Sequence, residues 1–310
     1  MVDRCMLLLI IVGSSCAGCG KASTPNLPTQ PEPAKEVFAV GGTGQIFHYN
    51  GNAWTPMTSG ITRNLHDVWG SSPTDVYAVG EVGTILHYDA ISWDAVVSGT
   101  RIPLEGVWGS GGHVFVVGLG DTTLHYDGSA WHVAAVGNPG LGLWGVWGSS
   151  PSNVFAVGAE AAVGGAILHW NGADWSPMAS GVPVALHGVW GSSANNVFAV
   201  GTGGTIVRYD GNSWSPMNSG TTADLWRVWG SSGTNVFATG AGGVIVRYNG
   251  SAWLPMTSGT NSGLVGVWGK SGSDVFVVGL GGTILHFNGN SWGPMTSGTT
   301  IFFTGVWGPP

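Results

Sequence analysis

The chain has 310 residues, of which 55 are glycine and 17 are tryptophan, and only 8% are charged. The net charge of −7, with nine lysines and arginines, excludes the basic surface that nucleic-acid binding requires. Glycine at this density excludes a helical fold, and the 43% of hydrophobic residues excludes a disordered chain, which leaves a folded β protein with many glycine turns.

The N-terminal segment has the layout of an export signal. Arg4 precedes the apolar run Met6–Val12, and small residues follow up to Cys19. A basic start, a short apolar core and a small-residue end are typical of a secretory signal peptide. The closing tripeptide Ala-Gly-Cys resembles the lipobox of bacterial lipoproteins, although Cys16 stands where that family prefers leucine. The resemblance implies lipidation of Cys19; the alternative is ordinary signal cleavage that leaves a free thiol.

We therefore expect three parts: a signal peptide over residues 1–19, a proline-rich tether over residues 20–35 and a folded body over residues 36–310. All three cysteines precede the body, so the body has no disulfide, no thiolate metal site and no cysteine nucleophile. The expected location is the bacterial cell envelope or surface, with membrane attachment through a lipid at Cys19.

The body consists of an internal repeat. Each period has four short segments rich in β-branched or aromatic residues, which begin Leu-x-x-Val-Trp, Asn/Asp-Val-Phe-Ala-Val, Thr-Ile-x-His/Arg-Tyr and Trp-x-Pro-Met. Glycine, serine or asparagine separates the segments, as expected of turns between strands. Four strands in about 40 residues are typical of a propeller blade. The Val-Trp-Gly tryptophans, at spacings of 39, 39, 43, 39, 39 and 39 residues, are Trp69, Trp108, Trp147, Trp190, Trp229, Trp268 and Trp307.

The repeat predicts an all-β, seven-bladed β-propeller with four-stranded blades. The body opens on a second strand, Val37–Val40, and ends on a first strand, Phe303–Trp307. One blade is therefore complete only if the C-terminal strand pairs with the N-terminal segment. This pairing closes the ring and removes an open sheet edge.

The repeat resembles the propellers of the photosystem II assembly factor family and the Asp-box (BNR) repeats of sialidases. It departs from the Asp-box pattern because His or Arg stands where that pattern has Ser or Thr. Its Asp-Gly…Trp turn also resembles the repeats of tachylectin-like and fucose-binding propeller lectins. The resemblance implies that the Leu-x-x-Val strand is innermost, and it specifies the fold better than the function.

Residues that recur in every blade are interpreted as packing residues. Fourteen tryptophans recur: the Val-Trp-Gly set and a second set that opens the fourth strand. Third-strand histidines also recur, one to a blade, so no two are expected to share a metal ion. We expect no metal and no cofactor. These histidines are His48, His87, His125, His169 and His286, with Arg208 and Arg247 in two other blades.

The second position of the inner strand is the one repeat position without a consensus. Because this position lies at the entry of every inner strand, its seven residues should surround one mouth of the channel. The next position is glycine in five blades, as a close approach at the axis would require, but Asp67 and Arg227 in the others. The predicted ligand-binding residues are Trp144, Trp226, His66, His187, Glu105, Asp67 and Arg227. The alternative is that these positions vary because nothing packs on them.

We expect a binding protein, not an enzyme. The sequence has no nucleophile elbow, no zinc-protease motif and no P-loop. A carboxylate pair for glycoside hydrolysis could come only from Asp67 and Glu105, and a sialidase-type hydrolase ranks last. The leading interpretation is an exported, monomeric scaffold that binds a protein partner at the mouth. The alternative is a lectin-like propeller that binds a glycan there.

Overall fold

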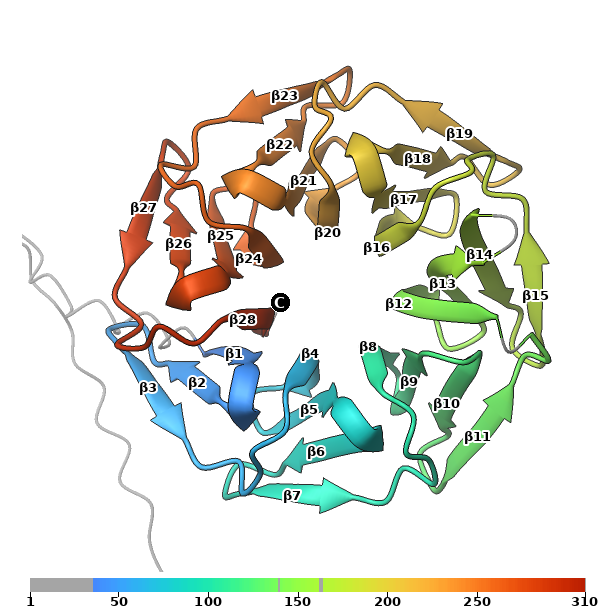
Figure 1. Ribbon diagram of the computed structural model, residues 1–310, viewed down its shortest axis with the longest axis horizontal. Coiled ribbons are helices and arrows are strands. Elements are labelled where there is room, and N and C mark those ends of the chain that lie inside the picture. The colour runs from blue at the N-terminus through green and yellow to red at the C-terminus, as the bar shows by residue number, and fades with distance from the viewer. Residues whose placement is uncertain (1–35, 139, 162–163, 310) are drawn as a thin grey trace, which may run out of the picture. The chain divides into compact units, whose positions relative to one another are not determined.

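The computed structural model describes residues 36–309 except residues 139, 162 and 163. The predicted signal peptide, the tether and Cys19 lie outside the described residues. Seven antiparallel sheets of four strands surround a central channel (Figure 1). The predicted seven-bladed propeller with four-stranded blades is therefore confirmed, and so is the innermost position of the Leu-x-x-Val strand.

The inner and second strands carry most of the apolar residues of each blade. The inner strands are β28 (Phe303–Trp307), β4 (Leu65–Ser72), β8 (Leu104–Ser110), β12 (Leu141–Ser150), β16 (Leu186–Ser193), β20 (Leu225–Ser232) and β24 (Leu264–Ser271). The second strands are β1 (Val37–Gly41), β5 (Asp75–Gly80), β9 (His113–Gly118), β13 (Asn153–Glu160), β17 (Asn196–Gly201), β21 (Asn235–Gly240) and β25 (Asp274–Gly279).

The outer half of each blade consists of the third strand and a short edge strand. The third strands are β2 (Ile46–Tyr49), β6 (Thr84–Tyr88), β10 (Thr122–Tyr126), β14 (Gly164–Trp170), β18 (Ile206–Tyr209), β22 (Ile245–Tyr248) and β26 (Ile284–Phe287). The edge strands are β3 (Trp54–Met57), β7 (Trp93–Val96), β11 (Trp131–Ala135), β15 (Trp175–Met178), β19 (Trp214–Met217), β23 (Trp253–Met256) and β27 (Trp292–Met295).

Short 3₁₀ turns join the second and third strands in five blades. They are η1 (Gly42–Gly44), η2 (Glu81–Gly83), η3 (Thr202–Gly204), η4 (Ala241–Gly243) and η5 (Leu280–Gly282). The blade with the four-residue insertion instead has longer strands: Ala159 pairs with Gly142 and with Gly165. Part of the additional sequence of this repeat therefore belongs to the sheet.

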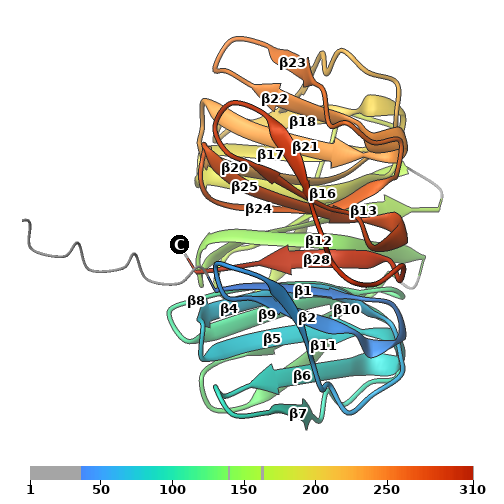
Figure 2. The same ribbon diagram turned by 90° about the vertical axis from the view of Figure 1, so that its left-hand side faces the viewer.

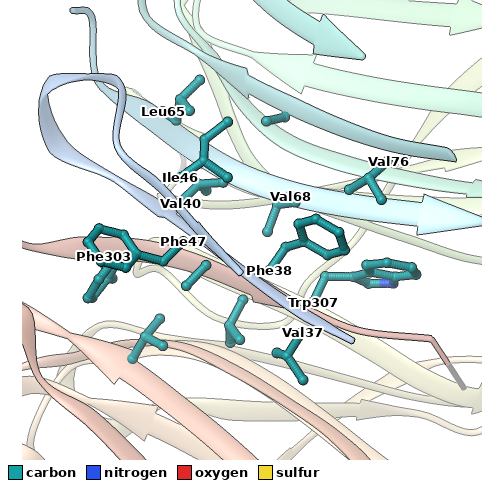
Figure 3. Packing of buried hydrophobic residues seen from close by; sticks show 14 of the residues in the cluster. Val37, Phe38, Val40, Ile46, Phe47, Leu65, Val68, Val76, Phe303 and Trp307 are labelled. Carbon is teal, nitrogen blue, oxygen red and sulfur yellow. The ribbon is translucent and has the colours of Figure 1, made fainter. Parts of the chain in front are cut away.

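The ring closes where the two ends of the body meet. β28 pairs with β1, with Phe38 opposite Trp307 and Ala39 opposite Val306, as the offset of the repeat predicts (Figure 2). Phe38, Trp307, Val68 and Leu65 come from three separate strands and lie in one apolar cluster (Figure 3). The C-terminal strand is thus part of the hydrophobic core.

The Val-Trp-Gly motif links each blade to the next. A Cβ added at Gly70 would lie 2.7 Å from the ring atom Cη2 of Trp307, so the indole of one blade rests on the bare backbone of the following one. Only glycine leaves room for that contact. The equivalent pairs are Trp69 on Gly109, Trp108 on Gly148, Trp147 on Gly191, Trp190 on Gly230, Trp229 on Gly269 and Trp268 on Gly308.

A second aromatic contact seals every blade boundary. The second-strand ring of one blade meets the edge-strand tryptophan of the next at a steep angle, as for Phe155 and Trp214, whose centroids are 5.9 Å apart at 82°. Edge-to-face contact is a favourable arrangement for two aromatic rings. The predicted packing role of both tryptophan sets is confirmed.

The third-strand histidines and arginines also have a repeated structural role. Each packs on the second-strand aromatic residue of its own blade, as His286 does on Phe276 at 4.5 Å. Each also bonds to the first residue of the second strand or the residue before it: Nε2 of His286 donates to Asp274 at 2.6 Å, and Nε of Arg208 donates to Asn196 at 2.7 Å. The expected packing role is confirmed.

One expectation about the strands was wrong in detail. The Gly-Ser-Ser sequence, expected to end the inner strand, continues it in most blades: Ser72 pairs with Asp75 in β5. The ladder shifts register just before this pair, so a bulge keeps the strand going past the glycine.

Candidate functional site

A β-bulge occurs at the same place in all seven inner strands. The ladder between β4 and β5 pairs Leu65 with Gly80 and then Asp67 with Val79, so that His66 has no partner opposite it. A bulge turns its extra residue out of the regular alternation of the strand. The seven bulge residues are His66, Glu105, Trp144, His187, Trp226, Val265 and Thr304.

These seven residues and Arg227 line one pocket at the channel mouth, with a volume of about 290 Å³. Six of the seven predicted site residues are therefore brought together. A volume at the lower end of the range for ligand sites accommodates one or two side chains or a single sugar ring. The walls combine two indoles, two imidazoles, a carboxylate and a guanidinium with small aliphatic groups.

One side of the pocket is an ion pair between successive blades. Nδ1 of His66 is 3.1 Å from Oε2 of Glu105 and donates to the carbonyl oxygen of Leu104, also at 3.1 Å. Burial lowers the pKa of His66, but the hydrogen bond and charge of Glu105 outweigh it, so the pKa lies above its ordinary value. His66 thus keeps its positive charge to higher pH than a free histidine.

The next part of the wall, from the two following blades, is aromatic. The rings of Trp144 and His187 have centroids 5.2 Å apart and planes at 44°. Nε2 of His187 lies 3.1 Å from the hydroxyl of Thr202 in η3. Burial, together with the positive charge of Arg227, lowers the pKa of His187, which keeps this imidazole neutral near pH 7. The two imidazoles of the pocket therefore differ in pKa, with that of His66 raised and that of His187 lowered.

Trp226 and Arg227 form the third part of the wall. A Cβ at Gly263 would lie 2.8 Å from the six-membered ring of Trp226, so glycine at the entry to β24 lets the indole lie against the backbone. Nη1 of Arg227 donates to the carbonyl oxygens of Trp226 and His187 at 3.3 and 3.4 Å. Among the described residues, no carboxylate forms an ion pair with Arg227.

Asp67 differs from the prediction, because it does not line the pocket. Its Oδ2 accepts a hydrogen bond from the backbone N–H of Val107 in the next inner strand, at 3.1 Å. Burial raises the pKa of Asp67, against the opposing charge of Arg227. The side chain joins two blades, so Asp67 and Glu105 do not face a ligand as a pair.

Five blades have glycine at the position equivalent to Asp67 and Arg227. The close approach that requires glycine there differs from the one expected. A Cβ at Gly188 would lie 2.8 Å from the carbonyl oxygen of Trp226, and one at Gly106 would lie 2.8 Å from that of Trp144. The close approach is to the neighbouring inner strand, not to residues across the axis.

Two lining residues, Val265 and Thr304, were not among the predicted site residues although they occupy the same repeat position. The hydroxyl of Thr304 donates to the carbonyl oxygens of Leu65 and Val40, at 2.7 and 3.1 Å. An alignment of the seven repeats could have added both residues to the predicted site. Thr202, from a different loop, had no such signal.

Two further findings concern the described residues alone. No group of three or more histidine, cysteine, aspartate or glutamate side chains among them is arranged to hold a metal ion. No helix in this part of the chain has the length and apolar character needed to cross a membrane.

The fold defines the class of this protein as a seven-bladed β-propeller. It has seven four-stranded blades, a ring closed by its own two ends and a pocket at one channel mouth. No protein-family model matches the sequence, and a search of curated proteins gives no match.

Solved structures share the fold. YCF48 from Cyanidioschyzon merolae has a TM-score of 0.65 at 15% identity, over 84% of this chain and 97% of that one. YCF48 bound to D1 peptide has a TM-score of 0.60 at 16% identity, over 88% of each chain. The WD40 propeller domain of Doa1 has a TM-score of 0.67 at 12% identity, over 83% of this chain and 87% of that one. The resemblance to photosystem II assembly factor propellers thus holds at the level of the fold.

Proposed function

We propose that this chain is a non-enzymatic binding propeller that holds a segment of a protein partner in the pocket at its channel mouth. The observation that carries the proposal is the convergence of all seven bulge residues on one pocket. Most other positions of the repeated strands follow a consensus that packing explains. The bulge position instead presents a different side chain from each blade to one shared space.

The chemistry of the pocket suits one or two side chains of a peptide. Trp144 and Trp226 offer apolar ring surface, and Arg227 offers a cation without a carboxylate partner among the described residues. Aromatic residues and arginine contribute most of the binding energy in protein interfaces. A structural neighbour, YCF48, was solved with a bound peptide, which supports a peptide ligand by analogy of fold.

A glycan is the second candidate, because indoles beside a carboxylate and imidazoles in a small concavity also suit a sugar ring. Catalysis is not part of the proposal. Arg227 is the one arginine that lines the pocket, and the carboxylate of Asp67 is engaged with Val107.

The test uses the double variant Trp144→Ala/Trp226→Ala with a peptide library and a glycan array as probes. We expect the wild-type chain to select peptides for the pocket, and the affinity of these peptides should fall about a hundredfold in the double variant, since each lost aromatic anchor costs ~1.4 kcal/mol. Leu254→Ala, at a half-exposed position of β23 outside the pocket, is the control. The proposal is overturned if none of the selected peptides loses affinity in the folded double variant, and glycan binding alone would favour the lectin.

We further propose export and lipid attachment at Cys19. The support is the signal layout of the sequence. In a bacterial host, Cys19→Ser should move the chain from the membrane fraction to the soluble fraction. An unchanged distribution would contradict the anchor. Sedimentation of the purified chain tests the proposed monomer.

A further inference from the structure

The outer edges of the seven blades are not equally protected. In five blades the third residue of the edge strand is proline, at Pro56, Pro177, Pro216, Pro255 and Pro294. In β7 the residue at this position is Ala95, and in β11 it is Val133. Proline on an exposed edge strand prevents another chain from pairing with it. Two adjacent blades therefore lack the protection that the other five have.

The register shows that the third residue of the edge strand would pair with an added strand. The backbone N–H of Asp89 donates to Ser92 at 3.4 Å, so these two residues form the first bonded pair of the β6–β7 hairpin. Bonded and non-bonded pairs alternate along antiparallel strands. Leu86 and Ala95 therefore form a non-bonded pair, and the N–H and C=O of Ala95 point away from β6 to the free edge. These are the groups with which an added strand pairs.

Exposed apolar side chains gather along the same edge. Ile91 and Val97, at the two ends of β7, are each 87% exposed. Val82 in η2 is 45% exposed and has a φ of 55°, where η3, η4 and η5 have glycine. A β-branched residue in this left-handed conformation is strained, so Val82 is not explained by the needs of the turn.

A groove of about 620 Å³ continues from the C-terminal end of β7. Val82, Val96 and Val97 supply its apolar wall, and Arg63 and Arg101 supply two cations. Both arginines are exposed, and neither forms an ion pair with any residue that the structure describes. The equivalent groove at β23 also has apolar residues in its wall, among them Val244 and Ile245, but it has no charged side chain.

We propose that β7, at the outer rim of the ring (Figure 1), accepts an extended segment of a protein partner as a fifth strand, with an acidic residue of that segment in the groove between Arg63 and Arg101. The free backbone groups of Ala95 supply the pairing, the valines receive aliphatic side chains, and the two cations select carboxylates. Strand addition at a sheet edge with pockets for alternate side chains is an established mode of peptide recognition. The surface is separate from the pocket at the channel mouth.

The experiment selects linear peptides from a phage-displayed library on the full chain. Peptides of about eight residues, at ~3.3 Å per residue, span β7 and the groove. Some of the selected peptides should still bind the Trp144→Ala/Trp226→Ala variant. We expect these peptides to carry aspartate or glutamate. Their affinity should fall about tenfold or more in Ala95→Pro and in Arg63→Ala/Arg101→Ala, and stay unchanged in the matched control Ala95→Val.

Folding is checked separately, by comparing the thermal melts of Ala95→Pro and Ala95→Val. Ala95→Pro installs the residue that five blades already carry, so it should fold. Val133→Pro, on the neighbouring edge, should leave binding unchanged. The proposal is overturned if the selected peptides are not acidic, if Ala95→Pro binds like Ala95→Val, or if sedimentation shows that Ala95→Pro converts a dimer into a monomer, because the occupant is then a second copy of this chain.

Discussion

The imidazole of His66 and the carboxylate of Glu105 form an ion pair between two successive inner strands, with Nδ1 3.1 Å from Oε2. Each is the bulge residue of its own blade, and they lie 39 positions apart in the sequence. The pair sets the charge on one side of the channel mouth. It also couples the mouth to pH, because the carboxylate holds the pKa of His66 above its ordinary value despite burial.

Removal of that carboxylate should reverse the shift. In Glu105→Gln, burial remains while the charge is lost, so the pKa of His66 should fall below its ordinary value of 6.5. A raised pKa stabilises the fold below the unfolded-state pKa, and this contribution is lost as pH rises through the folded-state pKa. Glu105→Gln should therefore destabilise the fold below about pH 6.5 and change it little at higher pH.

NMR titration of the histidine ring protons and urea denaturation at several pH values measure this effect. The pKa of His187, which depends on burial and on Arg227, is the internal control. An unchanged His66 pKa in the variant would contradict the role of Glu105.

A second pH effect should come from β9 and β10. Nδ1 of His113 lies 2.9 Å from Nε2 of His125, where the corresponding pair in β25 and β26 is Asp274 with His286. Burial, together with the neighbouring His113, lowers the pKa of His125. The fold therefore loses stability as pH falls from the ordinary histidine pKa of 6.5 toward this lowered pKa.

His113→Asp should remove this weakness by supplying the carboxylate that other blades have. We expect the pKa of His125 to rise and the midpoint of urea unfolding at about pH 5 to increase relative to the wild type. His169, which bonds to Asn153 in another blade, should titrate as before. Equal acid sensitivity of variant and wild type would count against the explanation.

The turn between β6 and β7 should be improved by glycine. Ala90 has a φ of 79°, whereas glycine occupies this place in the other blades, for example Gly128 at 94°. Ala90→Gly should stabilise the chain by up to about 1 kcal/mol in chemical denaturation, because a left-handed conformation costs ~1–2 kcal/mol for a residue with a Cβ.

Gly128→Ala is the matched reverse change. A Cβ there would have its nearest neighbour, the carbonyl oxygen of Gly112, at 3.7 Å, so only the backbone conformation opposes it. It should destabilise by about the same amount. A neutral result for both variants would show that the turn relaxes to relieve the strain.

Closure of the ring should depend strongly on Trp307. This side chain is 7% exposed, faces Phe38 with centroids 6.2 Å apart and rests on Gly70 of the next blade. Trp307→Ala should lower the free energy of unfolding by ~3–5 kcal/mol. Gly70→Ala, which brings a Cβ to 2.7 Å from the same indole, should lower it by ~1–3 kcal/mol.

Thermal denaturation followed by circular dichroism measures both variants. Ile91→Ser, at an 87% exposed position, is the control and should change stability by less than about 0.5 kcal/mol. A melt of Trp307→Ala that resembles the control would mean that the C-terminal strand is not needed for closure.

The sequence by itself determined the number of blades, the order of the strands and the closing pair of β28 with β1. A repeat makes such inferences secure, because each blade must bury the same surfaces and any residue shared by all blades is explained by that need. The same comparison singled out the inner-strand position without a consensus, whose residues line the pocket.

The tertiary structure alone decided what those residues contact. Bulges arise from ladder register, which the sequence pattern does not encode, and pairs such as Trp144 with His187 depend on the rotation between blades. For the same reason, Asp67 was placed in the site but bonds to the next strand, while Arg227, at the equivalent position, faces the pocket. The direction of a side chain at a crowded axis is set by the neighbouring blade, which lies about 40 residues away in the chain.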